Sequence, residues 1–224
     1  MGEQIRQEVC YPNLNVKIAC SHGGVTPAND GASHQSIEDM GVYRTIPNMT
    51  VIMPADYYAA KALVKEAAKT YGPMYLRFTR DAVPVIYDEN TKFEIGKAKK
   101  LTEGKDVAMI AIGDTVHLAL EAQKELEKAG ISARVLDMHT LKPLDKEAVL
   151  DCVRDIGRII TVEDHNILNG LGSAVCEIAA EAGGAKVKRV GIQDQFGMSA
   201  PYERLLEING ITVEHLVALA KQEW

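Results

Sequence analysis

The chain has 224 residues, of which 46% are hydrophobic and 25% charged, and its formal net charge is −6. This length allows one large or two small domains with real cores, and the acidic balance gives no reason to expect nucleic-acid binding. No apolar run reaches the ~18 residues that would span a bilayer, so no membrane association is expected. The four cysteines form no CxxC pair and lie in apolar contexts, which favours reduced, buried thiols in a cytoplasmic protein.

Strands and helices are predicted to alternate in the first part of the chain. The expected elements are a helix end at 3–10, strands at 15–21, 49–56 and 74–80, a helical segment at 35–43, and a helix at 57–70 with Asp56 as its N-cap. Doubly wound sheets usually have about five strands. Three strands and a start within a helix therefore predict an incomplete α/β domain over residues 1–90.

A linker is expected over residues 91–104, after which the alternation restarts. The expected elements are strands at 106–113, 132–138, 158–164 and 187–193, helices at 115–129, 145–155, 171–182 and 212–224, and Asp114 as the N-cap of the first of these helices. Runs such as "VAMIAI" are apolar on both faces, as strands covered by helices on both sides must be. We therefore predict a second α/β domain over 105–224 with a mostly parallel sheet, and a contact loop at 196–206 that presents Phe196, Met198 and Tyr202.

Candidate site residues follow the predicted strands of the first domain. The loop "SHGGVTPANDGASHQ" contains His22, Asp30 and His34 after the first strand, and Arg80 ends the third. If these strands are adjacent and parallel, their carboxyl ends share one rim, where open α/β sheets bind ligands. Arg80 with His22 suits a phosphate, His34 could transfer protons near neutral pH, and Asp30 could accept hydrogen bonds from substrate hydroxyls.

A simpler interpretation competes with this one, because loop histidines are commonly only solvated and Asp-Gly is a common turn pair. In the second domain, a Gly-x-Gly at 170–172 precedes a predicted helix and resembles a phosphate cradle. It lacks a third glycine, so we interpret it as a tight turn.

The stretch "SHGGVTPANDGASHQSIEDMGVYRTIPNMTVIMPAD" resembles the transketolase family, and so do "GPMYLRFTR", "DMHTLKPLD" and "VEDHNILNGLGSAV". The match is closest to the type encoded as two polypeptides, of which this chain would be the C-terminal one. The resemblance implies a partial pyrimidine-binding domain followed by a transketolase C-terminal domain. It also implies transfer of a two-carbon ketol unit between sugar phosphates with thiamine diphosphate, in the pentose phosphate pathway.

The resemblance also implies roles for single residues. His22 and Arg80 would hold the substrate phosphate, and Asp30 would contact the hydroxyl next to the reacting carbonyl. His34 would lie beside the cofactor and assist proton transfer. No residue is expected to bind a metal. Where split-type relatives usually have Gly-Glu-Asp-Gly, this chain has Ala-Asn-Asp-Gly at 28–31.

Other parts of the family machinery have no counterpart in the sequence. The activating glutamate and a stacking aromatic lie well upstream of the His22 position, and the diphosphate and Mg²⁺ belong to the other polypeptide. We therefore expect an N-terminally truncated section that is inactive alone, pairs with an N-terminal transketolase subunit and forms a homodimer.

Two alternatives stay open. One is a fragment of a 1-deoxyxylulose-5-phosphate synthase or a 2-oxo-acid dehydrogenase β-type subunit, because these proteins are similar in the second domain. The other is a non-catalytic dimerisation or interaction module, because a broken first domain should leave apolar surface uncovered.

Overall fold

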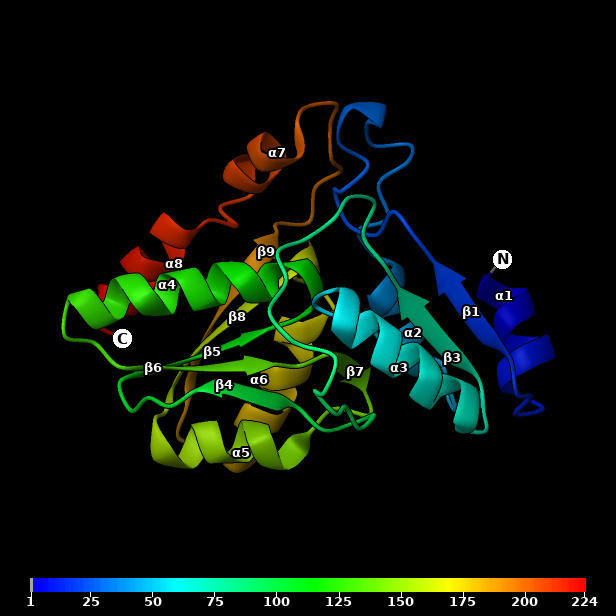
Figure 1. Ribbon diagram of the computed structural model, residues 1–224, viewed down its shortest axis with the longest axis horizontal. Helices are drawn as coiled ribbons and strands as arrows, with labels where there is room; N and C mark the ends of the chain where they lie inside the picture. Colours follow the sequence, from blue (N-terminus) through cyan, green and yellow to red (C-terminus); the bar gives the residue numbers. More distant parts are fainter. Residues whose placement is uncertain (1) are drawn as a thin grey trace.

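Three short apolar runs of the N-terminal part form adjacent parallel strands in the computed structural model, which describes residues 2–224 (Figure 1). The register sets Cys20 beside Arg77 and Ile52 beside Leu76, so all three strands end at the same edge of the sheet. The elements are α1 (Gly2–Gln4), a π-helical segment (Ile5–Cys10), β1 (Lys17–Cys20), a 3-10 turn (Ala28–Asp30), α2 (Asp39–Thr45), β2 (Thr50–Ile52), α3 (Tyr57–Lys69) and β3 (Met74–Arg77).

The C-terminal part forms a five-stranded sheet of order β4-β6-β5-β8-β9, in which only the edge pair β4 and β6 is antiparallel. This mostly parallel sheet and the parallel strands above confirm the predicted two α/β units. The elements are β4 (Lys99–Thr102), β5 (Val107–Ala111), a 3-10 turn (Gly113–Thr115), α4 (Val116–Lys128), β6 (Ala133–Asp137), β7 (Thr140–Lys142), α5 (Lys146–Asp155), β8 (Arg158–Asn166), α6 (Leu171–Ala182), β9 (Lys186–Ile192), α7 (Tyr202–Ile208) and α8 (Val213–Lys221).

Helices cover both faces of this second sheet, which explains why its central strand β5 is apolar along its whole length. Successive residues of β5 point to opposite faces, so Met109 packs in the core under α4 and α8, and Ile110 packs in the core over α5 and α6. Figure 1 shows α4 and α8 on one side of the sheet and α5 and α6 on the other. Burial of both faces by helices is the arrangement that parallel strands require.

The two units share strands and core. The unpredicted strand β7 pairs antiparallel with β2 and becomes the fourth strand of the N-terminal sheet, whose order is β1-β3-β2-β7. One buried cluster also joins Met40 and Tyr75 of the first unit to Ile110 and Leu171 of the second. The contiguous apolar burial makes the two units one packed body.

Several local predictions are confirmed and others are wrong. Asp56 caps α3, because its carboxylate accepts the N–H of Ala59 at 2.8 Å. Asp114 does not cap α4: it lies in the preceding 3-10 turn, and its buried carboxyl accepts the hydroxyl of Tyr202. Tyr202 is accordingly a packed residue at the start of α7, not part of an exposed contact loop.

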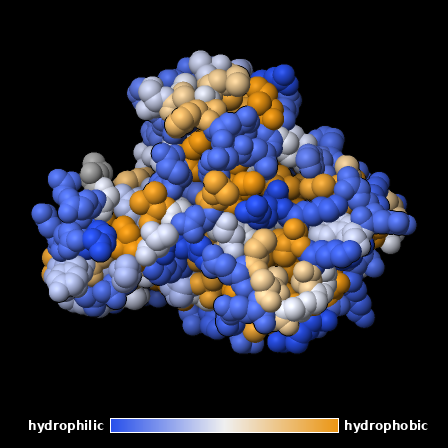
Figure 2. Space-filling model, turned by 180° about the vertical axis from the view of Figure 1, so that it is seen from behind, coloured by the Kyte–Doolittle hydropathy of each residue, from blue (hydrophilic) through white to orange (hydrophobic). Residues whose placement is uncertain are grey.

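The described surface contains scattered apolar side chains. Phe196 is 84% exposed, and Cys20 and Cys176 are only partly buried, in contrast to the prediction that all the thiols are buried. On the face shown in Figure 2, apolar residues lie in several patches among polar ones. None of the helices within residues 2–224 has the length and apolarity needed to cross a membrane.

Candidate functional site

Residues 21–35 form a loop, here called the rim loop, that leaves the end of β1 and stands over the edge where the parallel strands end. The backbone from Gly23 to Pro27 is buried, whereas the side chains of His22, Asp30 and His34 are exposed. A short bridge closes the loop on itself, because the N–H of Gly24 donates to the carbonyl of Ser36 at 2.7 Å. The loop therefore holds a buried backbone and offers its polar side chains to solvent.

Two glycines let the rim loop approach buried charges. A Cβ on Gly23 would overlap the guanidinium of Arg77, and a Cβ on Gly24 would overlap the carboxylate of Asp164. Gly24 also has φ +67°, a left-handed conformation that favours glycine. Any larger residue at either position would lift the loop off the residues beneath it.

Arg80 and Asp30 meet directly at the rim. One nitrogen of Arg80, Nη1, donates to Asp30 Oδ2 at 2.5 Å and to the carbonyl of Pro27 at 2.9 Å. Among the side-chain hydrogen bonds of residues 2–224, none uses Nε or Nη2 of Arg80. Arg80 thus keeps two donors on one edge for an oxyanion, the geometry in which guanidinium binds phosphate in a bidentate manner.

His22 and His34 lie on the same loop but form no hydrogen bond with Arg80 or Asp30 in the described chain. His22 follows Ser21, whose hydroxyl pairs with its Nδ1 at 2.8 Å, and Ser33 pairs with Nδ1 of His34 at 3.0 Å. The N–H of Gly23 donates to Phe78 at 3.0 Å, which sets His22 beside the strand end that leads to Arg80. No hydrogen bond within residues 2–224 uses Nε2 of either imidazole, so both nitrogens can bind a ligand.

Beneath the rim loop lies a buried ionic cluster centred on Arg77. Its Nε donates to Asp39 at 2.9 Å, and its Nη2 donates to the carbonyls of Ser36 at 2.9 Å and Asp164 at 3.0 Å. Asp39 also accepts the hydroxyl of Tyr75 at 2.6 Å. Arg77 is completely buried, so its charge depends on these partners.

The cluster holds more carboxyl groups than positive charges. Burial lowers the pKa of Arg77, but Asp39, Asp164 and Asp114 outweigh it, so that its pKa is raised. Burial, together with the neighbouring Asp114, raises the pKa of Asp164 well above its usual range, and burial likewise raises the pKa of Asp114. One guanidinium cannot neutralise all of these buried groups, so Asp164 and Asp114 keep their protons at pH values where exposed carboxyls would have lost them.

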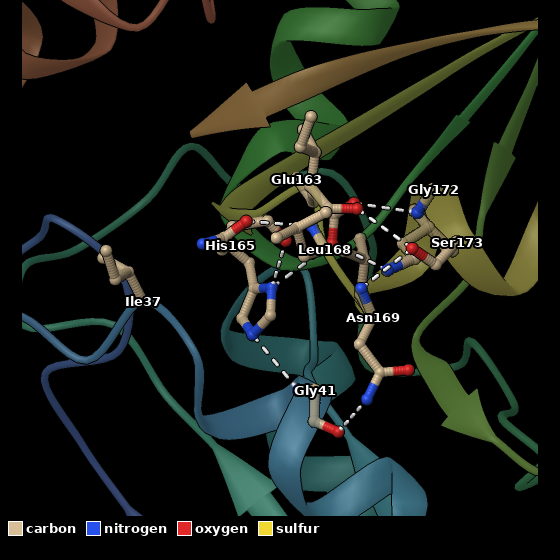
Figure 3. A network of polar contacts seen from close by, with 12 residues as sticks. Ile37, Gly41, Glu163, His165, Leu168, Asn169, Gly172 and Ser173 are labelled. Atoms are coloured by element: carbon tan, nitrogen blue, oxygen red, sulfur yellow. Dashed lines mark hydrogen bonds and ion pairs between the residues drawn. The ribbon is translucent and has the colours of Figure 1, made fainter. Parts of the chain in front are cut away.

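The "VEDHN" motif continues this buried polar layer along β8 (Figure 3). Glu163 accepts the N–H groups of Leu171 and Gly172 at 2.7 and 2.8 Å, so the first amides of α6 are already used. Burial raises the pKa of Glu163 to about 7, although these two bonds oppose the shift. The predicted tight turn at Gly170–Gly172 fits this arrangement better than a phosphate cradle does.

His165 faces α2 rather than a ligand. Burial, with the nearby charge of Arg77, lowers its pKa to about 4, so the ring is neutral. Its Nδ1 donates to the carbonyl of Asn166 at 2.6 Å, and Nε2 accepts the N–H of Gly41 at 3.2 Å. Asn169 donates to the carbonyl of the same Gly41 at 2.7 Å (Figure 3). His165 and the nearby Asn169 therefore join the C-terminal unit to α2 of the N-terminal unit by hydrogen bonds.

The four predicted site residues all lie at the rim, and two of them, Asp30 and Arg80, are in contact. The residues that support them, Arg77, Asp164 and Ser199, were missed by the sequence reasoning. A charged residue inside the buried strand "MYLR" was a signal for Arg77, because an arginine is rarely fully buried without partners. Ser199 lies 170 positions from Asn29, its partner, and no local pattern indicates such a contact.

Two family models match the chain. The transketolase pyrimidine-binding domain matches residues 1–85, and the transketolase C-terminal domain matches residues 96–216. The pyrimidine-binding match therefore falls on the N-terminal sheet, and the C-terminal match falls on the five-stranded sheet.

Known proteins are similar over nearly the whole chain. A putative transketolase C-terminal section from Methanocaldococcus jannaschii is 44% identical, covering 99% of this chain and 70% of that protein. A 1-deoxy-D-xylulose-5-phosphate synthase from Geobacter sulfurreducens is 39% identical, covering 96% and 34%. A solved structure described as a split gene transketolase, inactive beta4 tetramer, is 46% identical with a TM-score of 0.91, covering 98% and 70%.

Proposed function

Because the chain belongs to the transketolase family, we propose that it supplies the sugar-phosphate side of the active site of a two-polypeptide transketolase. The observation that carries this proposal is the rim itself. Arg80 has a free guanidinium edge, Asp30 holds that guanidinium in place, and two exposed imidazoles lie on the same loop. His22 and Arg80 bind the phosphate of the substrate, and His34 moves a proton near the reacting oxygen.

Asp30 has two roles in this proposal. Its Oδ2 pairs with Arg80, which orients the guanidinium, and its Oδ1 is left to accept a substrate hydroxyl. The exposed ion pair contributes little to stability, of the order of 0–1 kcal/mol. The ion pair instead orients the guanidinium of Arg80, so that its hydrogen-bond donors are in position before a phosphate binds.

Thiamine diphosphate, when bound, supplies the carbon nucleophile that breaks and remakes the carbon–carbon bond. The part of it that fits this chain is the pyrimidine end, since the exposed ring of His34 can exchange a hydrogen bond with a polar ring substituent. We propose that the diphosphate and Mg²⁺ are held by the complementary polypeptide. The α6 N-terminus, a natural anion site, is already filled by Glu163.

The remaining parts of the proposal concern assembly and surroundings. The similar solved protein described as an inactive beta4 tetramer supports inactivity of this section by itself and self-association, whereas the homodimer stays a prediction. The division into domains at 1–90 and 105–224, the cytoplasmic location and the pentose phosphate pathway stay predictions.

The test is a ketol-transfer assay with the chain, a complementary N-terminal transketolase polypeptide, thiamine diphosphate and Mg²⁺. We expect transfer from a ketose phosphate to an aldose phosphate only when both polypeptides are present. The variant Arg80→Met should raise KM for the phosphorylated substrates about 10- to 100-fold, because charge-assisted hydrogen bonds contribute roughly 1.5–3 kcal/mol.

The matched control is Arg154→Met, which removes an exposed arginine on α5 and should leave KM unchanged. Equal effects of the two variants would contradict the role of Arg80. The 39% identical synthase makes condensation of pyruvate with an aldose phosphate the second candidate reaction. Release of CO₂ from pyruvate by the complex, without ketol transfer, would favour that reaction over transketolase.

A further inference from the structure

The rim loop is held at its base by the C-terminal unit. The N–H of Val25 donates to both side-chain oxygens of Asp164 on β8, to Oδ1 at 3.1 Å and to Oδ2 at 3.0 Å, which fixes the beginning of the loop. The guanidinium of Arg77 donates to the backbone carbonyls of Ser36 at 2.9 Å and Asp164 at 3.0 Å. Because Ser36 directly follows the rim loop, these bonds fix the end of the loop. Both ends of the loop are therefore held by the same two buried residues, Arg77 and Asp164.

The helix that follows the loop is fastened in the same way. The N–H of Asn166 donates to the carbonyl of Ile37 at 2.7 Å, and His165 and Asn169 bind both backbone groups of Gly41 in α2 (Figure 3). These bonds all come from residues 165–169, at the end of β8 and directly after it. The base of the loop thus has little freedom to shift as long as this stretch is intact.

The tip of the rim loop has a separate anchor, the clamp, which we define as residues 197–199. The hydroxyl of Ser199 donates to the carbonyl of Asn29 at 2.7 Å. The side-chain amide of Gln35 donates to the carbonyls of Met198 at 3.0 Å and Ala28 at 3.3 Å. Figure 1 shows the blue rim loop beside the orange segment that precedes α7.

The clamp packs closely against the loop at Gly197. A Cβ on Gly197 would overlap the amide of Gln35, and a Cβ on Gly31 would touch Ser199 at 3.6 Å. The clamp is itself held in place just beyond its end, where Tyr202 donates to the buried Asp114. The clamp therefore contacts residues 28–31, the part of the loop that includes Asp30.

This contact bears on the position of Arg80 as well. Arg80 is held by Asp30, which lies in the segment that the clamp contacts, and by the carbonyl of Pro27, which directly precedes that segment. A displacement of residues 27–30 would move both partners of the guanidinium together. Positioning by supporting residues of this kind is what keeps binding groups within a fraction of an ångström of their productive geometry.

We propose that the clamp of the C-terminal unit is a positioning element for the sugar-phosphate site, in which Gly197 and Ser199 fix the rim loop without touching substrate. This inference rests on the function proposed above. Under it, the C-terminal unit holds the phosphate-binding guanidinium at a fixed place relative to the loop histidines.

The experiment compares Gly197→Ala and Ser199→Ala with the control Ser132→Ala, in which a hydroxyl bonded to Asp106 in an exposed turn is removed. Hydrogen exchange of the peptide covering residues 21–35 is measured in the full chain. We expect at least threefold faster exchange of this peptide in the two clamp variants and no change in the control.

Steady-state kinetics of the two-polypeptide complex give the second readout. We expect KM for the sugar phosphates to rise about 3- to 10-fold in the clamp variants, with kcat changed less than twofold. Unchanged exchange of residues 21–35 would overturn the positioning role, and so would faster exchange with an unchanged KM. If the wild-type complex shows no ketol transfer, the proposed function fails, while the exchange measurement still decides whether the clamp holds the loop.

Discussion

Polar residues lie near the carboxyl ends of strands in both units, but the two units use them differently. In the N-terminal unit, His22, His34 and Arg80 are exposed at the strand ends. In the C-terminal unit, the corresponding residues, such as Asp137 and Asp164, are buried and bonded internally. Only the exposed set can bind a ligand, and the buried set fixes the backbone on which the exposed set stands.

Arg77 and Arg80 show this difference within three residues of one another. Arg77 ends β3 with its guanidinium fully buried among carboxyl and carbonyl oxygens. Arg80 lies just beyond the strand, with its side chain 38% exposed. The same residue type is thus structural at one position and available for binding at the other, because the rim loop covers only the first.

The largest expected effect comes from removing the buried guanidinium. Arg77→Met should lower the free energy of unfolding by about 3–5 kcal/mol, because it leaves Asp39 buried without its cation and the carbonyls of Ser36 and Asp164 without their donor. Urea denaturation measures the change. Arg80→Met is the matched control and should change the unfolding free energy by no more than about 1 kcal/mol, as expected for an exposed ion pair.

Equal losses of stability in these two variants would contradict the contrast between the units. If Arg77→Met does not fold, Asp39→Asn is a milder substitution in the same cluster. It should still cost more than Asp30→Asn, which removes the negative charge from the exposed pair.

A smaller effect should appear as pH dependence. Burial raises the pKa of Asp137 to about 7, and Tyr87 donates to its carboxyl at 2.7 Å. The unfolded chain has an ordinary value near 3.9, so the unfolded state loses this proton first as pH rises. The stabilising contribution of the protonated group is therefore fully present below about pH 4 and is lost as pH approaches 7.

We expect wild type to lose about 2–3 kcal/mol relative to Asp137→Asn between pH 5 and 7, at 1.36 kcal/mol per pKa unit. Urea denaturation at several pH values measures this difference. Asp151→Asn, a substitution of an exposed carboxyl on α5, is the control and should show no such trend. A constant difference between wild type and Asp137→Asn across this range would show that Asp137 is ionised in the folded state.

The smallest effect concerns backbone strain at the rim. His22 has φ 65°, a left-handed conformation that costs a residue with a Cβ roughly 1–2 kcal/mol. His22→Gly should therefore leave thermal stability unchanged or raise it by about 0.5–1 kcal/mol. The same substitution should weaken phosphate binding, which isothermal titration with a sugar phosphate measures on the two-polypeptide complex.

His34→Gly is the control in the same loop, because His34 does not have a positive φ. It should bring no gain in stability. A loss of stability in His22→Gly as large as in His34→Gly would show that the left-handed backbone at His22 carries no strain.

Much of the fold could be predicted because it depends on local signals. Alternating apolar runs predicted the parallel strands, and Asp56 was recognised as a cap because a cap acts within three residues. Asp114 looked like an equally good cap. It is not one, because a distant partner, Tyr202, binds its carboxyl. Strand β7 was missed because its three residues, Thr-Leu-Lys, do not lie in an apolar run, whereas the equally short β2 does.

The sequence by itself determined the two α/β units, the family and the candidate residues of the rim, since these depend on patterns within single segments. Only the tertiary structure decided which polar residues are buried and which are free. That choice is made by contacts between residues far apart in the chain, such as Asp164 with Val25 and Ser199 with Asn29. Whether a charge is solvated or paired depends on what packs over it, and packing over a charge is not a local property.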